Sequence, residues 1–171
     1  MEKKKFTIDN NMLAANIAKE ISLAIFDKIT KNAERNKGDY LPSTFDLYNL
    51  AFACELFLKI ILSENNIKVN RNHKLKTLFD SLNKPIKNTI TEIYNSGPTI
   101  NKNKPNFIEA LAKSSNSFIR YRYIYENIDK FFANRKEDTE FLMYFVKALD
   151  DYLRITYVPY YAGAKRLFKK R

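Results

Sequence analysis

The 171-residue sequence contains little that breaks helices or cross-links chains. Its three glycines and five prolines fall between the periodic apolar segments, which is typical of helices joined by short loops. A single cysteine, Cys54, excludes an intrachain disulfide and a cysteine-based zinc site. Because Cys54 lies in an apolar run, we expect it to be buried as a small hydrophobic residue.

Several motifs that carry chemistry are also missing. There is no glycine-rich phosphate loop and no paired histidine or cysteine spacing for a metal, so we expect no metal and no organic cofactor. The basic start at residues 1–6 is not followed by the apolar region of a signal peptide. The longest apolar run, residues 50–62, is too short to cross a bilayer. These absences predict a cytoplasmic protein with no membrane partner.

The residues that are present favour an all-α, single-domain helical bundle of about four to six helices. Hydrophobic residues make up 45% of the chain, which excludes a disordered chain, and the length fits one domain with its own core. We expect a basic N-terminal segment at 1–10, the bundle at 11–158 and a basic C-terminal tail at 159–171. The predicted helices span residues 11–36, 43–64, 73–82, 85–95, 107–127 and 138–158, with a turn at 134–136.

The charge balance points to a polyanion partner. Thirty basic and nineteen acidic residues give a formal net charge of +11 at pH 7. RNA or DNA is the first expectation and an anionic membrane surface the second. Alternatively, the high lysine content reflects only the use of lysine as the default solubilising residue. The net charge is compatible with both interpretations.

The predicted second helix is apolar almost all round between Leu50 and Leu62, which is typical of a central, buried helix. Its only charges in that run are Glu55 and Lys59, four residues apart and therefore on one face. Buried charges are costly unless they are paired. We therefore expect Glu55 and Lys59 to pair with each other or with charges from another helix.

The long helix predicted at 107–127 offers such partners. On a helical wheel Arg122 falls within the inward stripe and Glu126 at its edge, whereas Arg120 points to solvent. An arginine on a core-facing stripe needs a carboxylate, and Glu55 is the candidate. The same segment alternates basic and aromatic residues, including Tyr123, a pattern that can also stack nucleobases beside a cationic clamp.

His73, the only histidine, opens the short third helix and is the side chain best suited to proton transfer near neutral pH. Two interpretations of the polar set Glu55, Lys59, His73, Arg122 and Glu126 remain open. The set either braces the bundle as a structural ion-pair network or forms a functional site, since both kinds of network look alike in sequence.

Three segments resemble the HEPN superfamily of small prokaryotic helical bundles. They are Ala-Cys-Glu-Leu-Phe-Leu-Lys at 53–59, Asn-His-Lys-Leu-Lys-Thr-Leu-Phe at 72–79 and Phe-Ile-Arg-Tyr-Arg-Tyr-Ile-Tyr-Glu at 118–126. Their order and spacing are similar to a subgroup with a Glu-x-x-x-Lys helix, a His-x-Leu-x-x-Leu helix start and an Arg-Tyr-x-x-Glu segment. The similarity covers roughly residues 40–155.

The resemblance implies a homodimeric bundle that acts in anti-phage defence or a toxin–antitoxin system. Active members of the superfamily cleave RNA without a metal, using an arginine followed after four to six residues by a histidine. Here His73 has Arg71 only two residues before it, so that motif is absent. The content of 13 Phe and 11 Tyr also favours a homodimer, because a symmetric interface covers rings that one small core does not enclose.

Three functions follow from these observations. The first is a HEPN-like module that binds RNA, a nucleotide or a partner protein without the standard nuclease motif. The second is a metal-independent endoribonuclease in which His73 is the general acid or base, Arg122 and Lys59 stabilise the charged transition state, and Glu55 orients them. The third is a non-enzymatic dimerisation or adaptor bundle.

Overall fold

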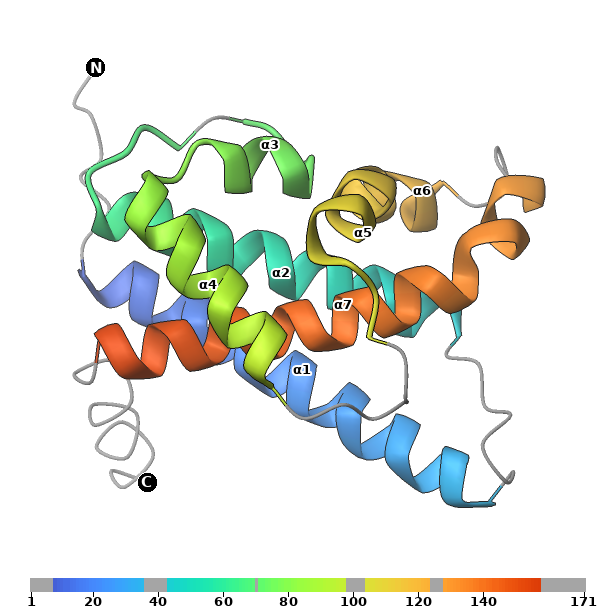
Figure 1. The fold of residues 1–171 in the computed structure, drawn as a ribbon. Helices are drawn as coiled ribbons and strands as arrows, with labels where there is room; N and C mark the ends of the chain where they lie inside the picture. Colours follow the sequence, from blue (N-terminus) through green and yellow to red (C-terminus); the bar gives the residue numbers. More distant parts are fainter. Residues whose placement is uncertain (1–7, 36–42, 70, 98–103, 124–127, 158–171) are drawn as a thin grey trace, which may run out of the picture.

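A computed structural model describes residues 8–35, 43–69, 71–97, 104–123 and 128–157, and within these ranges the structure is helical with no strand (Figure 1). The all-α bundle predicted from the sequence is confirmed. The helices are α1 (Ile8–Arg35), α2 (Thr44–Glu64), α3 (Leu75–Asp80), α4 (Lys84–Ser96), α5 (Phe107–Lys113), α6 (Ser117–Arg122) and α7 (Ile128–Thr156), with a 3-10 turn, η1 (Ser114–Asn116), between α5 and α6.

Helix α2 is the centre of the bundle and contacts α1, α3, α6 and α7. Ser43 caps its N-terminus in a reciprocal capping box with Asp46. Burial by itself would raise the pKa of Asp46, but hydrogen bonds from Lys28 and Ser43 outweigh it and hold that pKa below the usual carboxyl value. In Figure 1, α1 lies on one side of α2 and α3, α5 and α6 on the other.

The core forms around α2 as its apolar run predicts. Phe57 and Leu58 are fully buried there, and Cys54 is buried as expected. Burial raises the pKa of the Cys54 thiol, which keeps it neutral. The main aromatic contribution from α7 comes from Phe141 and Phe145, whose rings stack 5.1 Å apart.

Helix α1 packs on α2 through its small residues. Ala15 and Ala18 are buried, whereas Leu13 keeps 60% of its surface exposed and Ile17 is exposed as well. The apolar residues of α1 recur at helical spacing, as predicted. The face that meets α2, however, is the one with the alanines, because small side chains let the two helices approach most closely. An aliphatic stripe is therefore left on the outer side of α1.

Two predicted boundaries are wrong. The helix expected at 107–127 is divided, because Ser114 and Ser115 in η1 are buried and bond to neighbouring elements instead of facing solvent. The Ser114 hydroxyl donates to Asp138 of α7, and the Ser115 hydroxyl accepts from the Lys76 amide of α3 at 3.2 Å. The turn expected at 134–136 lies inside α7. The predicted basic tail at 159–171 and most of the N-terminal segment lie outside the described residues.

Candidate functional site

Glu55, Lys59 and His73 form one contact cluster, hereafter the Glu55 cluster. The Glu55 carboxylate, with its side chain only 4% exposed, accepts a hydrogen bond from Lys59 Nζ at 2.6 Å. His73 Nδ1 lies 2.9 Å from Glu55 Oε1 and 3.1 Å from Oε2. The predicted pairing of Glu55 with Lys59 is confirmed, and His73 joins them from the loop that precedes α3.

The His73 ring is held in one orientation with one edge open. A carboxylate only accepts hydrogen bonds, so the short contact assigns the proton of His73 to Nδ1. No described residue hydrogen-bonds to Nε2, and the side chain is 46% exposed. One face of the ring stacks on Phe118 of α6, with centroids 5.2 Å apart. The buried Glu55 carboxylate therefore fixes Nδ1 of His73, and Nε2 of the same ring is left open to a ligand.

Phe118 connects this histidine to further rings of α2. Its ring stacks on Tyr48 at 5.1 Å and on Phe52 at 5.8 Å. Phe118 itself is buried, while Tyr48 and Phe52 are partly buried. A row of rings thus runs along the N-terminal half of α2 and ends at the exposed His73.

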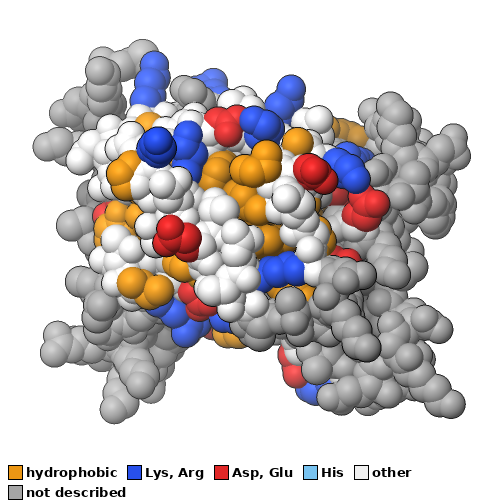
Figure 2. Space-filling view, in the orientation of Figure 1, with side chains coloured by type: hydrophobic (Ala, Val, Ile, Leu, Met, Phe, Trp, Pro, Cys, Tyr) orange, Lys and Arg blue, Asp and Glu red, His pale blue; other side chains and the backbone are white. Residues whose placement is uncertain are grey.

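His73 has basic residues on either side of it in the chain. Arg71 and Lys74 flank it in the chain, are exposed, and have no ion-pair partner among the described residues. Figure 2 shows basic side chains along the upper edge of the molecule, where α3 lies in Figure 1. We call the surface made by Lys59, Arg71, His73 and Lys74 the His73 face.

The predicted contact between Arg122 and Glu55 is wrong. Arg122 is exposed, with its guanidinium carbon 5.5 Å from the centre of the Tyr123 ring. Arg120 and Arg122 lie on opposite sides of the buried face of α6. Among the described residues, only the side that carries Arg120 meets a carboxylate. Arg120 was expected in solvent, yet its side chain is only 16% exposed. Glu126 lies outside the described residues.

Arg120 belongs to a second polar cluster, which was not predicted from the sequence. We call it the Asp138 cluster, and its members are Ser114, Arg120, Tyr121 and Asp138. Asp138 is almost fully buried in α7 and accepts from Arg120 Nη1 at 2.5 Å, from the Ser114 hydroxyl and from the Tyr121 hydroxyl. Burial, and next the Asp138 charge, raises the pKa of Tyr121 above its usual value. The sequence gives no signal for this cluster, because Asp138 lies within the charged run at 135–140 and looks like a solvent-facing residue.

An open apolar pocket of about 360 Å³ lies where the start of α2 meets α6. We call it the Phe45 pocket, and its lining residues are Thr44, Phe45, Tyr48, Tyr121 and Arg122. Phe45 is 71% exposed, which is unusual for a phenylalanine. Tyr48 belongs both to this pocket and to the row of rings that ends at His73.

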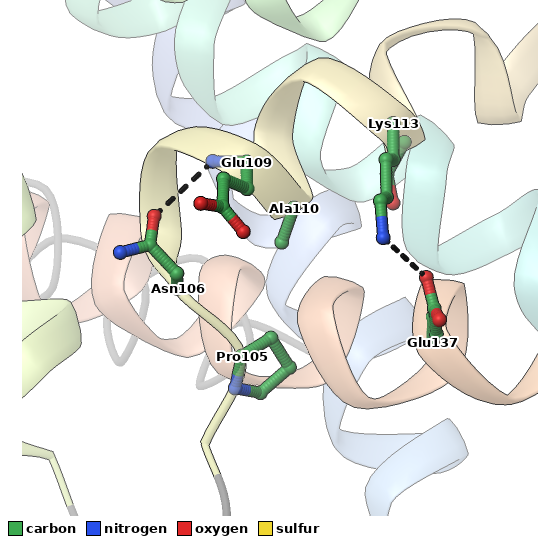
Figure 3. A pocket seen from close by; sticks show the side chains of 7 residues that line it. Pro105, Asn106, Glu109, Ala110, Lys113 and Glu137 are labelled. Carbon is green, nitrogen blue, oxygen red and sulfur yellow. Dashed lines mark hydrogen bonds and ion pairs between the residues drawn. The ribbon is translucent and has the colours of Figure 1, made fainter.

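A smaller pocket of about 240 Å³ lies between α5 and α7 (Figure 3). Its polar lining is mainly Glu109, Lys113 and Glu137, and Lys113 pairs with Glu137 at 3.1 Å. Asn106, at its rim, caps the start of α5 by accepting from the Glu109 amide. Two carboxylates against one ammonium make this pocket a poor site for a polyanion, and none of the predicted site residues lies in it.

Comparison of the chain with protein-family models, with curated proteins and with solved structures finds no match. The HEPN resemblance therefore stays a prediction. Among the described residues there is no group of three or more His, Cys, Asp or Glu side chains placed to hold a metal ion. None of the helices described here combines the length and the hydropathy that crossing a membrane requires.

Proposed function

We propose that this chain binds single-stranded RNA on the His73 face, as a HEPN-like module of a prokaryotic defence or toxin–antitoxin-type system. The observation that supports it is the meeting of the three segments that carry the resemblance. Glu55 and Lys59 come from the first, His73 from the second and Phe118 from the third, and they are in contact at one place. A shared site is the simplest reason for three such segments to converge.

The chemistry of this face suits a nucleic-acid backbone. Lys59 shares the Glu55 carboxylate with His73, and two further basic residues, Arg71 and Lys74, flank His73 in the chain and are exposed. A phosphate can accept hydrogen bonds from the lysine and arginine donors, and the exposed part of His73 offers a ring face to a base. The net charge of +11 strengthens the attraction at long range.

Binding of a fluorescent single-stranded RNA at low salt tests the proposal. Affinity should fall steeply as salt rises, and Lys74→Ala should weaken binding and lower the salt slope by about one. Lys113→Ala is the matched control, because it removes the same charge from the acidic pocket between α5 and α7. If the wild-type chain binds no RNA at low salt, the proposal fails and the adaptor bundle takes its place.

A metal-independent endoribonuclease is a second candidate, favoured by the contact between Glu55 and His73 Nδ1. A carboxylate that fixes one imidazole nitrogen leaves the other to accept a proton, here from a ribose 2′-hydroxyl that attacks the adjacent phosphorus. A 2′,3′-cyclic phosphate forms as the bond from phosphorus to the 5′-oxygen breaks, and that oxygen leaves as a hydroxyl after taking the proton back from the imidazolium. Lys59 bonds to the same Glu55 oxygen as this imidazole and is the cation expected to stabilise the transition state, whereas Arg122 is not part of the cluster. RNA incubated with a chelator should be cleaved by wild type and left intact by His73→Gln. Uncleaved RNA with the wild-type chain would refute catalysis and leave binding standing.

A homodimer is expected from the same resemblance. The described rings give it little support, since only Phe45 and Tyr123 among the large aromatic side chains are markedly exposed. The aliphatic stripe of α1, with Leu13 and Ile17, is the better candidate surface for a second copy. Sedimentation at high micromolar concentration should show a dimer that Ile17→Glu dissociates and Ile155→Glu, an equally drastic exposed change on α7, does not.

A further inference from the structure

We infer that the Phe45 pocket binds an unpaired nucleobase of the RNA strand whose backbone lies on the His73 face. This inference rests on the proposed function and adds to it a site for a base, linked to His73 through the rings of Tyr48 and Phe118. It assigns roles to Phe45 and Tyr48 as stacking surfaces and to Arg122 as the cation beside the bound nucleotide.

The walls of the pocket are aromatic and partly uncovered. Phe45, Tyr48 and Tyr121 line it, and the Tyr121 hydroxyl is already bound to Asp138, so this ring offers only its apolar surface. Phe45 lies one residue inside α2, where the capped helix start fixes its backbone. A ring held in place on a rigid helix with 71% of its surface exposed is suited to stacking on a flat partner.

The charge of the pocket selects an anionic partner. Arg122 is its only charged lining residue among those described, and no carboxylate lines it. The guanidinium lies 5.5 Å from the Tyr123 ring centre, where it can contact the phosphate next to a base held between the aromatic walls. The lining thus combines ring surface with a single cation, which matches a nucleotide.

The pocket is linked to His73 through one buried ring. Tyr48 lines the pocket and stacks on Phe118 at 5.1 Å, and Phe118 stacks on His73 at 5.2 Å. We therefore place one base of the strand in the pocket, with the backbone of the same strand passing outside the buried Phe118 toward Lys59 and Lys74. Aromatic rings beside a basic track are the usual arrangement in proteins that bind single strands.

A comparison of base-bearing and abasic oligonucleotides tests the inference. Wild type should bind a short single-stranded oligouridine about tenfold more tightly than an oligonucleotide of the same length that carries abasic sites. Phe45→Ala should bring the affinity for the base-bearing strand down to that for the abasic one and leave abasic binding unchanged. Ile155→Ala, which removes another exposed apolar side chain far along α7, should keep the preference.

The outcomes separate this inference from the proposed function. If wild type binds both oligonucleotides equally, or if Phe45→Ala keeps the preference, the pocket does not hold a base, although RNA binding on the His73 face stands. If no oligonucleotide binds, the proposed function itself fails. If Phe45→Ala instead abolishes binding of a protein partner and leaves RNA binding untouched, the pocket is a protein-docking site and the inference is overturned. Circular dichroism melts of each variant confirm that the fold is retained.

Discussion

The Glu55 cluster and the Asp138 cluster are both built around a carboxylate that is almost fully buried, yet their partners differ. Asp138 is enclosed by Ser114, Arg120 and Tyr121, and the Arg120 side chain that pairs with it is itself largely buried. Glu55 bonds to Lys59 and His73, whose side chains reach solvent. The first network joins η1 and α6 to α7, whereas the second joins α2 to a loop at the surface.

This difference separates stability from function. A closed network loses its charge balance when one member is removed, so its residues are expected to matter for folding. An open one can be rehydrated when a member is removed, so its residues can be altered at lower cost to stability and remain available to a ligand. The measurements below test that separation, from the largest expected effect to the smallest.

Asp138→Ala should destabilise the protein by about 3–5 kcal/mol, because it leaves the partly buried Arg120 guanidinium without its carboxylate. The melting temperature should fall by roughly 10 °C in a domain of this size. Thermal unfolding followed by circular dichroism measures it. Asp151→Asn, which removes an exposed partner of Lys147, is the control and should change the melting temperature by about a degree. Equal effects for both would contradict the closed-network assignment.

The neighbouring arginines should behave in opposite ways. Arg120→Ala should cost about 2–3 kcal/mol, because Asp138 would keep only its two hydroxyl donors. Arg122→Ala should stay within about 0.5 kcal/mol of wild type, since that side chain is exposed. Urea unfolding of the two variants decides the matter. If Arg122→Ala lost more stability than Arg120→Ala, Arg122 would be the arginine that faces the core, as the helical wheel predicted.

The pH dependence of stability should carry a contribution from Tyr121. Its pKa in the folded state is raised above the ordinary value of 10.0, so the stabilisation is fully present below about pH 10 and is lost as the pH rises further. In Tyr121→Phe the free energy of unfolding should fall less steeply with rising pH, by at most about 1.4 kcal/mol per pH unit. Urea unfolding between pH 8 and 11 would show it, and an unchanged slope would mean that the hydroxyl is not held as described.

Glu55→Gln should lower stability by only about 1 kcal/mol, because the amide keeps an acceptor for Lys59 and the neighbouring groups reach water. It should lower RNA affinity as much as His73→Ala does, since the imidazole loses the carboxylate that orients it. Glu109→Gln, an exposed change of the same type, should affect neither. A loss of several kcal/mol with unchanged RNA binding would make the Glu55 cluster a structural brace like the other.

Ser117→Ala should have the smallest effect. The Ser117 hydroxyl is fully buried and has no hydrogen-bond partner among the described residues, although it lies next to Phe118 in the contact region of α6. Replacing an unsatisfied buried hydroxyl with a methyl group is neutral or slightly stabilising. A destabilisation of about 1 kcal/mol or more would reveal a partner for this hydroxyl.

The sequence predicts the fold and the members of the Glu55 cluster, but not the Asp138 cluster. The apolar circumference of 50–62 was enough to place α2 in the centre, and the spacing of Glu55 and Lys59 was enough to pair them. The partner of Arg120 could not be predicted, because two arginines on opposite edges of one helical stripe look alike until the neighbouring helix is placed. The break at 114–116 was missed for a similar reason, since its serines are buried by bonds to α3 and α7 that lie far away in the chain.

The hydrogen bond from the Lys76 amide to Ser115 has a consequence for how the site opens. A six-residue helix does not persist alone, and no side chain of its own caps α3. Its start, next to His73, is completed by a turn that lies 39 positions further along the chain. Amide hydrogen exchange at Lys76 should therefore follow the undocking of 114–118, and the orientation of His73 should be lost in that same local opening, well before the bundle as a whole unfolds.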